Sequence, residues 1–421
     1  MSKRVDVLVV GGGSAGATAA IAAARSGAET LLVDRLGFLG GTSTAVLDTF
    51  YAFFTPGREP WKVVSGIPDE VVAGLEAEGA CFPRPNTYGA GTGITYDPEV
   101  LKRVWERLVL AAGARVLLHA FVHGVDVVDG RVAAVRLWTK GGERVVEADC
   151  VVDASGDADV CHLAGAPYEG PSEQTQSLST VFRLANVDVA RAEAVPKQEL
   201  WALMREARDS GRYALPRIEG SVHRTPQAGV MMALMTRMRN VDATDPEQLT
   251  AAELEGRRQC HEYFRFLREH VPGYEQAVLV STSPAIGVRE SRRILGEAVL
   301  TAEDVLGARS FPDQIARCGA PIEEHHAGAD TRWVYLEEGA AYGIPYRALL
   351  PREVDGLVVA GRCFSATHDA HASARSMATC MAMGQAAGTA AALAASAGTA
   401  PRSLDAAALR ERLRGDGADV G

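Results

Sequence analysis

The chain has 421 residues, of which 47% are hydrophobic and 23% charged, a composition typical of a soluble globular protein. This length is too great for one typical core and predicts two domains, or one domain with a large insertion. The formal net charge of −10 counts against nucleic acid or an anionic membrane as the main partner. It leaves local arginines free to bind a small anion.

The cysteines do not form a disulfide or metal-binding pattern. They number seven, and no two have C-x-x-C spacing, so free thiols in a reducing cytoplasm are expected. The apolar run 5–24 follows Lys3 and Arg4, as a signal peptide or membrane span would. Asp6 and a central glycine cluster argue against both, so we expect a cytoplasmic protein without a membrane partner.

The first 34 residues have the pattern strand, glycine turn, helix, strand. Residues 5–10 form a β-rich run, residues 15–26 an alanine-rich helix that Gly27 closes, and residues 30–34 a second strand. This is a βαβ unit.

Further along, the pattern changes twice. Residues 45–95 predict loops and short elements, and residues 98–112 an amphipathic helix. A β-meander is expected at 114–120, 121–128, 131–139 and 143–148, followed by a buried strand at 150–153 and a loop at 154–159. From residue 166 we expect helices at 197–210 and 246–269, strands at 179–184, 230–235 and 357–360, and a final helix at 374–395.

The strongest local motif is Gly11-Gly12-Gly13-Ser14-Ala15-Gly16, a G-x-G-x-x-G between the first strand and the first helix. Its glycines permit a tight turn, close approach to a pyrophosphate and close helix–sheet packing. Asp34 ends the next strand, where an acid accepts hydrogen bonds from ribose hydroxyls. The motif predicts dinucleotide binding. The alternative is a glycine turn in an ordinary α/β protein.

Downstream features favour FAD over NAD. They are Gly40-Gly41-Thr42, the β-meander, Ala154-Ser155-Gly156-Asp157, and Gly361-Arg362 before the closing helix. The sequence has no second G-x-G-x-x-G and no C-x4-C pair, which argues against a dedicated NAD(P)H domain of the disulfide-reductase kind.

With these segments the chain resembles FAD-dependent oxidoreductases of the glutathione-reductase-like FAD fold, distantly similar to fumarate-reductase flavoproteins. The resemblance rests on VVGGGSAGATAAIAAARSGAETLLVD, VVDASGDADVCHLAGAP, GVRESRRILGE, YGIPYRALLPREVDGLVVAGRCFSATHDAHASARS and CMAMGQAAGTAAALA. It implies an α/β fold: a discontinuous Rossmann-like FAD-binding domain with a β-meander insertion, at 1–165 and 346–421, and an α+β substrate or cap domain at 166–345.

The resemblance also implies which residues bind FAD. They are Gly11, Gly13, Ser14, Ala15, Gly16, Asp34, Arg35, Gly40, Gly41, Thr42, Val122, Ala154, Ser155, Gly156, Asp157, Gly361, Arg362, Ser376 and Met377. Related enzymes with covalent FAD carry a histidine after the second glycine pair. Residues 41–45 contain neither histidine nor cysteine, and Cys363 is expected to be a buried thiol, so noncovalent FAD is predicted.

The segment 367–376 is the predicted active site, because the resemblance places it along the isoalloxazine ring. His371 and His368 are candidate bases for a flavin oxidation, the alternative being a structural role. Their H-x-x-H spacing could also suit a metal, but no third ligand is evident, so none is expected.

Arg375 and Arg289 are predicted to hold a carboxylate or carbonyl. The neighbours of Arg289 have plainer alternatives: Arg292 on a solvated face, and Arg293 paired with Glu297 on a helix. His325 and His326 are expected in a polar loop.

The predicted reaction is dehydrogenation of a small organic molecule by hydride transfer to flavin N5, with O2 or another acceptor restoring the flavin. Alternatives are reduction of an activated alkene or carbonyl, an FAD-dependent monooxygenase, and a non-catalytic FAD-binding electron-transfer subunit. The expected partner is a small-molecule substrate, and a homo-oligomer is compatible with the sequence.

Overall fold

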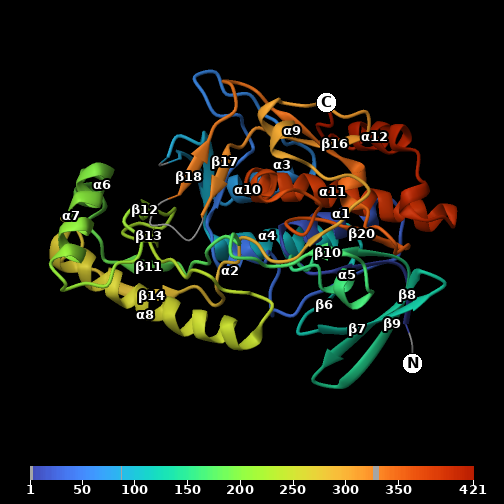
Figure 1. Ribbon diagram of the computed structural model, residues 1–421, viewed down its shortest axis with the longest axis horizontal. Coiled ribbons are helices and arrows are strands. Elements are labelled where there is room, and N and C mark those ends of the chain that lie inside the picture. The colour runs from blue at the N-terminus through green and yellow to red at the C-terminus, as the bar shows by residue number, and fades with distance from the viewer. Residues whose placement is uncertain (1–2, 87, 326–330) are drawn as a thin grey trace.

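The computed structural model describes residues 3–86, 88–325 and 331–421 (Figure 1). At its centre, β1 (Lys3–Val10) lies between β2 (Thr30–Val33) and β9 (Gly142–Asp153), parallel to both. Two further parallel strands, β6 (Arg115–Leu117) beside β2 and β20 (Leu357–Val359) beside β9, extend this arrangement. Their apolar runs are buried on both faces at the centre, as parallel sheets require.

The predicted meander is present with a different first strand. β7 (Phe121–Val128), β8 (Arg131–Thr139) and the first half of β9 pair antiparallel. The expected strand at 114–120 instead gives β6, which belongs to the parallel sheet. The expected strands 143–148 and 150–153 are one strand, because β9 keeps its register with β1 through Asp149.

Two helices of small residues pack against the sheet and against each other: α1 (Ser14–Arg25) and α11 (Met377–Ala397). Their backbones approach closely. A Cβ on Gly384 would lie 2.1 Å from the carbonyl oxygen of Ala15, and one on Gly388 2.1 Å from that of Ala19. The predicted helix 374–395 is α11, which begins three residues later than expected, because the extended backbone of Ser376 separates it from a short preceding helix, α10 (His368–Ala374).

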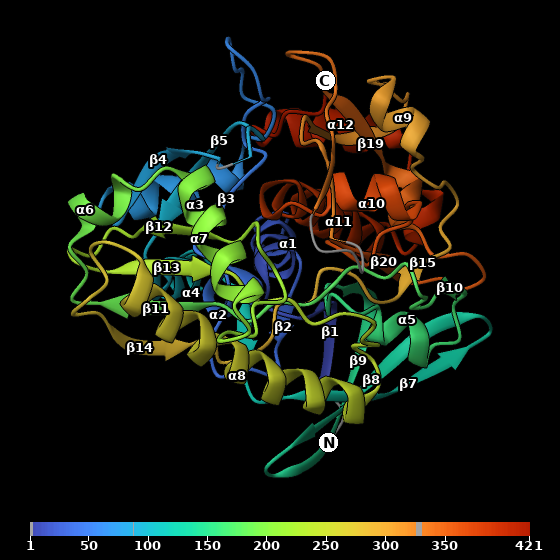
Figure 2. The ribbon, with the colours of Figure 1, turned by 60° about the vertical axis from the view of Figure 1, so that its left-hand side comes forward.

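A second unit covers one end of the molecule (Figure 2). Its antiparallel sheet has the order β12-β13-β11-β14 and shares a core with α7 (Lys197–Asp209) and α8 (Pro246–His270), which confirms the two predicted helices. The strands are β11 (Phe182–Ala185), β12 (Ser221–Arg224), β13 (Met231–Leu234) and β14 (Val278–Thr282).

The cores divide the chain unevenly. The core of the second unit extends from Phe182 to Ala277, whereas Ile294, Ile315 and Ile344 are buried with the parallel sheet. The predicted domain boundaries stay a prediction, but packing favours an end near residue 288 for the second unit rather than 345.

The other elements connect or flank these layers. Residues 45–95 contain a full helix, α3, and a three-stranded sheet β3-β5-β4, more regular structure than expected. Within the described ranges, no helix is both long and apolar enough to cross a membrane. The remaining elements are α2 (Thr42–Ala45), β3 (Thr49–Phe50), α3 (Ile67–Glu76), β4 (Cys81–Pro85), β5 (Thr92–Tyr96), α4 (Pro98–Ala111), α5 (Asp159–Leu163), β10 (Tyr168–Glu169), α6 (Val189–Glu193), β15 (Arg293–Ile294), α9 (Ala302–Leu306), β16 (Gln314–Cys318), β17 (Ile322–Glu324), β18 (Arg332–Val334), β19 (Tyr342–Pro345), the 3-10 turns Tyr346–Leu349 and Pro401–Ser403, and α12 (Ala406–Gly415).

The close contact between α1 and α11 predicts that no residue larger than glycine fits at position 388. Gly388→Ala should lower the free energy of unfolding by about 2 kcal/mol or more, because its methyl group must push two backbones apart. Gly415→Ala is the matched control: its position on α12 is exposed, and a Cβ there meets nothing within 4 Å. Urea unfolding measures both, and equal stabilities would contradict the close packing.

Candidate active site

One cavity of about 320 Å³ joins the glycine motif to the second unit. It lies at the carboxyl ends of β1 and β2, where ligands bind in open α/β sheets. Its wall includes the N-terminal ends of α1 and α11 and residues from the sheet of the second unit.

The glycine motif forms a cradle that side chains would fill. Gly11 has a φ of +96°, and a Cβ there would lie 2.3 Å from the carbonyl oxygen of Ala154. A Cβ on Gly16 would collide with the carbonyl oxygen of Gly11. Gly13 differs, because a Cβ added there would meet only the Cα of Gly41, 4.0 Å away. Gly13 itself lines the cavity. The space in front of Gly13 is thus free for a ligand at the positive end of α1.

Asp34 stands beside this cradle at the end of β2. Its Oδ1 accepts a hydrogen bond of 2.6 Å from the Leu36 N–H, and its Oδ2 one of 2.5 Å from the Gly12 N–H. Burial raises its pKa, and these two hydrogen bonds oppose that effect. The carboxylate is 7% exposed and lines the cavity, so its remaining lone pairs fit ribose hydroxyls.

A second polar group fixes the loop after β9. Arg362 donates to Asp157 Oδ1 at 2.7 Å and to the Ser291 hydroxyl at 2.9 Å. Burial raises the pKa of Asp157, but Arg362 and Ser291 outweigh it and hold the pKa below its usual value. Arg362 is thereby held on the wall beside Gly156.

Most predicted cofactor residues meet in this cavity. Gly16, Gly40, Val122 and Asp157 are not on its wall: Gly16 and Gly40 shape the turns behind it, Asp157 supports Arg362, and Val122 lies on β7. The wall contains Gly11, Gly13, Ser14, Ala15, Asp34, Arg35, Gly41, Thr42, Ala154, Ser155, Gly156, Gly361, Arg362, Ser376 and Met377.

Both predicted arginines lie on the same wall. Arg289 donates to the Ser177 carbonyl at 2.6 Å and the Ser179 hydroxyl at 2.9 Å. Arg375 donates to Gln176 Oε1 at 3.0 Å and to the Glu323 carbonyl at 3.2 Å. The Nε of Arg375 is buried, and no hydrogen-bond partner for it is present in the described chain.

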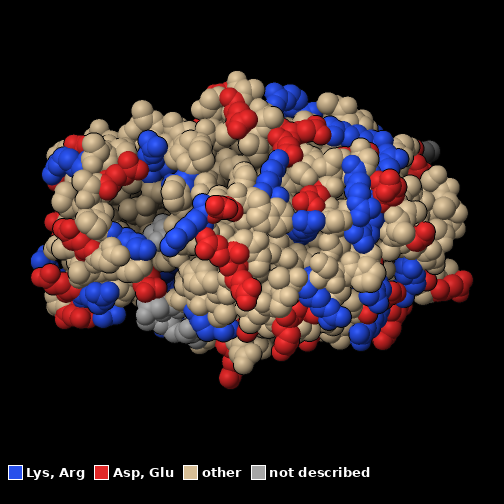
Figure 3. Space-filling view, turned by 90° about the horizontal axis from the view of Figure 1, so that it is seen from above, with Lys and Arg blue, Asp and Glu red and all other residues tan. Residues whose placement is uncertain are grey.

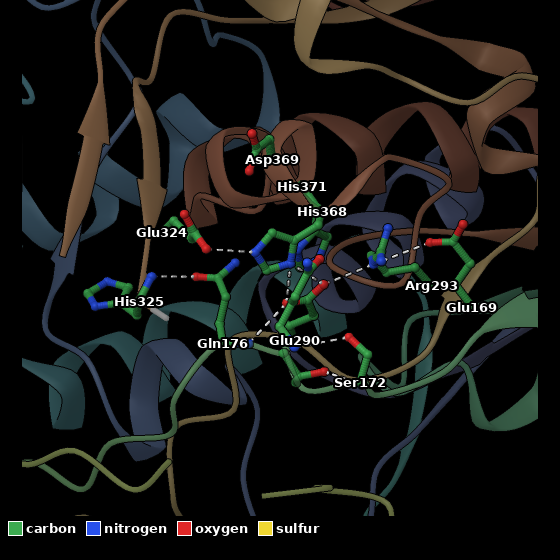
Figure 4. A network of polar contacts seen from close by, with 12 residues as sticks. Glu169, Ser172, Gln176, Glu290, Arg293, Glu324, His325, His368, Asp369 and His371 are labelled. Atoms are coloured by element: carbon green, nitrogen blue, oxygen red, sulfur yellow. Dashed lines mark hydrogen bonds and ion pairs between the residues drawn. The ribbon is translucent and has the colours of Figure 1, made fainter. Parts of the chain in front are cut away.

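The two predicted histidines are not on the wall. His368 lies between Glu290 and Glu324, 3.0 and 3.3 Å from their oxygens (Figure 4). Burial lowers its pKa, but these carboxylates outweigh burial and raise it. Both ring nitrogens of His368 contact carboxylate oxygens, which only accept hydrogen bonds, so neither nitrogen offers a lone pair for a base.

His371 is fully buried, and its Nε2 donates to the Arg362 carbonyl at 2.7 Å. Burial lowers its pKa to about 3, so it is neutral. Its Nδ1 is buried without a hydrogen-bond partner in the described ranges. The predicted base role of both histidines thus has no support from their positions.

The structural roles expected for three further residues, Arg292, Arg293 and His325, need correction. Arg293 lies on β15, not a helix, and pairs with Glu290 and Glu169, whereas Glu297 pairs with Arg402. Arg292 is largely buried and pairs with Asp159 at 3.1 Å. His325 is 3% exposed rather than part of a polar loop, and its ring contacts Glu323 and Thr331. His326 lies outside the described residues.

Glu324, His368 and Asp369 lie close enough together to hold a metal ion. Arg332 already pairs with both carboxylates and supplies the positive charge there. We assign no ion to this group.

The sequence missed much of the cavity wall. Arg217, His223 and Asp48 carry charge or protons there, and Tyr88 stacks on Trp333 with ring centroids 5.2 Å apart. None of them belongs to a local motif. Asp48 follows α2 and His223 lies on β12, so only the tertiary fold brings them together.

Comparison with known proteins agrees with this geometry. The model of the FAD-dependent oxidoreductase family matches residues 6–413. The chain belongs to this family. FAD is its cofactor.

Individual relatives are distant. The chain is 29% identical over 133 residues to digeranylgeranylglycerophospholipid reductase 3 of Methanosphaera stadtmanae, and the match covers 28% of this chain and only 30% of that relative. A geranylgeranyl bacteriochlorophyll reductase-like structure from Thermoplasma acidophilum has a TM-score of 0.53 at 15% identity, covering 99% of this chain and 83% of that one. The flavin-dependent brominase Bmp2 has a TM-score of 0.50 at 11% identity, covering 98% and 83%. Such identities show a shared fold.

The cradle predicts a specific way to lose FAD. Gly13 has ordinary backbone angles (φ −65°, ψ −177°), so Gly13→Ala should fold normally. Its methyl group would occupy the space next to the pyrophosphate, and the affinity for FAD should fall at least about tenfold. Visible absorbance after desalting measures the retained FAD. Gly141→Ala, in a turn where a Cβ meets only Thr139 Oγ1 at 3.7 Å, is the control. Full retention in Gly13→Ala would contradict the assignment.

His371 predicts an acid-sensitive contribution to stability. Its folded pKa of about 3 lies below the ordinary 6.5, so between these values only the unfolded chain binds the proton. Stability should fall as pH falls through that window, by up to about 1.4 kcal/mol per pH unit. His371→Gln keeps a donor for the Arg362 carbonyl but does not titrate, so it should show a shallower slope. Denaturant unfolding at several pH values tests this, and identical slopes would contradict it.

Proposed function

We propose that this FAD-dependent oxidoreductase dehydrogenates a small organic anion inside the cavity. The proposal is carried by one observation: the glycine cradle shares its cavity with the arginines Arg217, Arg289 and Arg375. A dinucleotide cradle and a cluster of partly and fully buried cations in one space suit a flavin and an anionic substrate side by side.

The charge on this wall is unbalanced. Three carboxylates line it, those of Asp34, Asp48 and Glu323, against six arginines: Arg35, Arg84, Arg217, Arg289, Arg362 and Arg375. Burial, and then the charges of Arg375 and Arg217, lower the pKa of Arg289 well below its ordinary value. Arginine stays protonated in proteins, so Arg289 is a buried cation beside other cations, an arrangement that a bound anion would stabilise.

Two donors support the same interpretation. The Nε atoms of Arg217 and Arg375 are buried and lack hydrogen-bond partners among the described residues. Arg217 is only 1% exposed. Buried polar groups are normally satisfied, and planar guanidinium groups match carboxylates well. Over the face seen in Figure 3, basic and acidic side chains are interspersed.

Bound FAD supplies a two-electron acceptor for a hydride from a C–H bond of the substrate. The arginines orient the substrate by its charged end, which fixes the position of that C–H bond. Tyr88 and Trp333 add an apolar aromatic wall that excludes water.

We also propose that FAD is held noncovalently. On the described wall the one cysteine is Cys380, and burial raises its pKa to about 12. Cys380 is therefore a protonated thiol and a poor nucleophile. Cys363 is fully buried behind the wall, in contact with the Asp153 carbonyl.

Reduction of an activated alkene or carbonyl would use the same residues in reverse. Visible absorbance distinguishes this reaction from dehydrogenation, because an alkene or carbonyl substrate would not bleach oxidised FAD. An electron-transfer subunit is less well supported, since it requires no cavity with buried charged groups.

The test is anaerobic mixing of the FAD-loaded protein with lactate, mandelate, malate and succinate, followed by visible absorbance. At least one acid should bleach the flavin, while the uncharged amides of the same acids should not. Arg375→Gln should raise the Kd for the reacting acid by about tenfold to a hundredfold, because it removes one charge from the wall.

Arg332→Gln is the matched control, because Arg332 lies at the separate group of Glu324 and Asp369. It should leave the Kd unchanged. Equal bleaching by acids and amides, or by none of them, would overturn the proposal.

A further inference from the structure

A buried histidine–aspartate pair joins the two units at the cavity wall. His223 on β12 and Asp48, which follows α2, lie 2.9 Å apart between Nε2 and Oδ1. Asp48 is 1% exposed and His223 9%, and both line the cavity. A contact this well buried is costly unless its charges and hydrogen bonds are balanced.

The pairing determines which ring nitrogen is free. Burial raises the pKa of Asp48, but His223, Arg183 and Arg84 together outweigh burial and hold the pKa below its ordinary value, so Asp48 is a carboxylate. A carboxylate only accepts hydrogen bonds, and therefore Nε2 of His223 carries the hydrogen. In the neutral ring the lone pair is then on Nδ1. Between described residues, the one side-chain hydrogen bond of His223 is the bond of Nε2 to Asp48, which leaves Nδ1 unused.

Other charged groups around the pair do not titrate near neutrality. Arg84 and Arg183 are near enough to Asp48 to lower its pKa, and arginines remain protonated. Burial raises the pKa values of Tyr51 and Tyr96, so both stay phenols.

No other histidine of the described wall offers a lone pair. His325 is the other one, and both its ring nitrogens have partners: Nε2 contacts Glu323 at 2.9 Å, and Nδ1 contacts Thr331 at 3.1 Å. Burial and the neighbouring arginines lower its pKa well below the ordinary value. His368 and His371 lie off the wall.

We propose that His223 is the catalytic base of the dehydrogenation and that Asp48 positions it. The inference rests on the proposed function. In oxidation of a hydroxy acid, the C–H hydrogen leaves as hydride with its two electrons, which reduce FAD. The O–H bond breaks, its proton forms a new N–H bond at Nδ1 of His223, and the substrate gains a C=O double bond. The imidazolium so formed is stabilised by the Asp48 carboxylate.

Three variants separate this role from a structural link between the units. His223→Gln keeps an N–H donor for Asp48 but removes the base. Asp48→Asn keeps the size of the side chain and removes the charge. Gln227→Ala removes a different contact between the units, the 2.8 Å hydrogen bond from Gln227 to Asp97, at an exposed site.

The first measurement is the rate of anaerobic FAD reduction by the hydroxy acid, lactate, mandelate or malate, that bleaches the wild-type flavin fastest. His223→Gln should slow it on the order of 10² to 10⁴-fold, with little change in Kd and in the unfolding midpoint. Asp48→Asn should slow it less, and Gln227→Ala should leave it unchanged. An unaltered rate in His223→Gln would overturn the inference while leaving the proposed function standing. Failure of every acid to bleach wild type contradicts the proposed function instead.

The second measurement needs no turnover. Nitrogen-15 NMR of the FAD-loaded protein, with the His223 signal identified by its loss in His223→Gln, reports the ring tautomer. We expect hydrogen on Nε2, a lone pair on Nδ1, and a shift of Nδ1 when benzoate is added as a nonreacting acid. Hydrogen on Nδ1, or no response to benzoate, would overturn the inference whatever the panel acids do.

Discussion

The site depends first on how closely α1 and α11 approach each other. Gly384 and Gly388 place their backbone against the carbonyls of Ala15 and Ala19, where no side chain fits. This contact joins the first and last parts of the chain into one layer over the parallel sheet (Figure 1). It also sets the N-terminal ends of both helices on the same cavity, at Ser14 and at Met377. Two positive helix ends then face one space, which suits a cofactor that is anionic at its pyrophosphate and gains charge at its ring on reduction.

The second unit supplies what this layer lacks. Arg217 and His223 come from it or from its connecting loops. Arg217 contacts Tyr88 and His223 contacts Asp48, two residues of the first unit, which is the part of the chain built on the parallel sheet. The part of the wall where FAD is predicted to bind is thus largely backbone and small residues from the two ends of the chain, whereas charged side chains of the middle dominate the rest of the wall. This arrangement allows one FAD layer to serve different substrates, because changes in the middle of the chain leave the cradle intact.

The sequence predicts the wall formed by the two ends of the chain better than the wall formed by its middle. The glycine turn, Asp34 and the first strands are local, since a few adjacent residues define both the backbone and its ligand. The meander and α8 were also predictable, from alternation and helical periodicity. Arg375 and Arg289 are predictable as site candidates because they lie within segments that carry the family resemblance. Arg217 and His223 have no such signal: each is one polar residue in a short strand or loop, and its role arises from contacts with residues more than a hundred positions away.

The predicted histidines show why residue type alone misleads. The resemblance places His368 and His371 along the flavin ring. In the structure, α10 sets His368 between two carboxylates and buries His371 against the Arg362 carbonyl. A base needs both a lone pair and access to the substrate; His368 lacks the lone pair, and neither ring reaches the wall. His223 lines the cavity, and because its carboxylate partner contacts Nε2, the Nδ1 lone pair of the neutral ring is left unused. Since that partner belongs to the other unit, the tautomer of His223 depends on the two units being in contact. The interface between the units is therefore part of the chemistry of the site as well as of its enclosure.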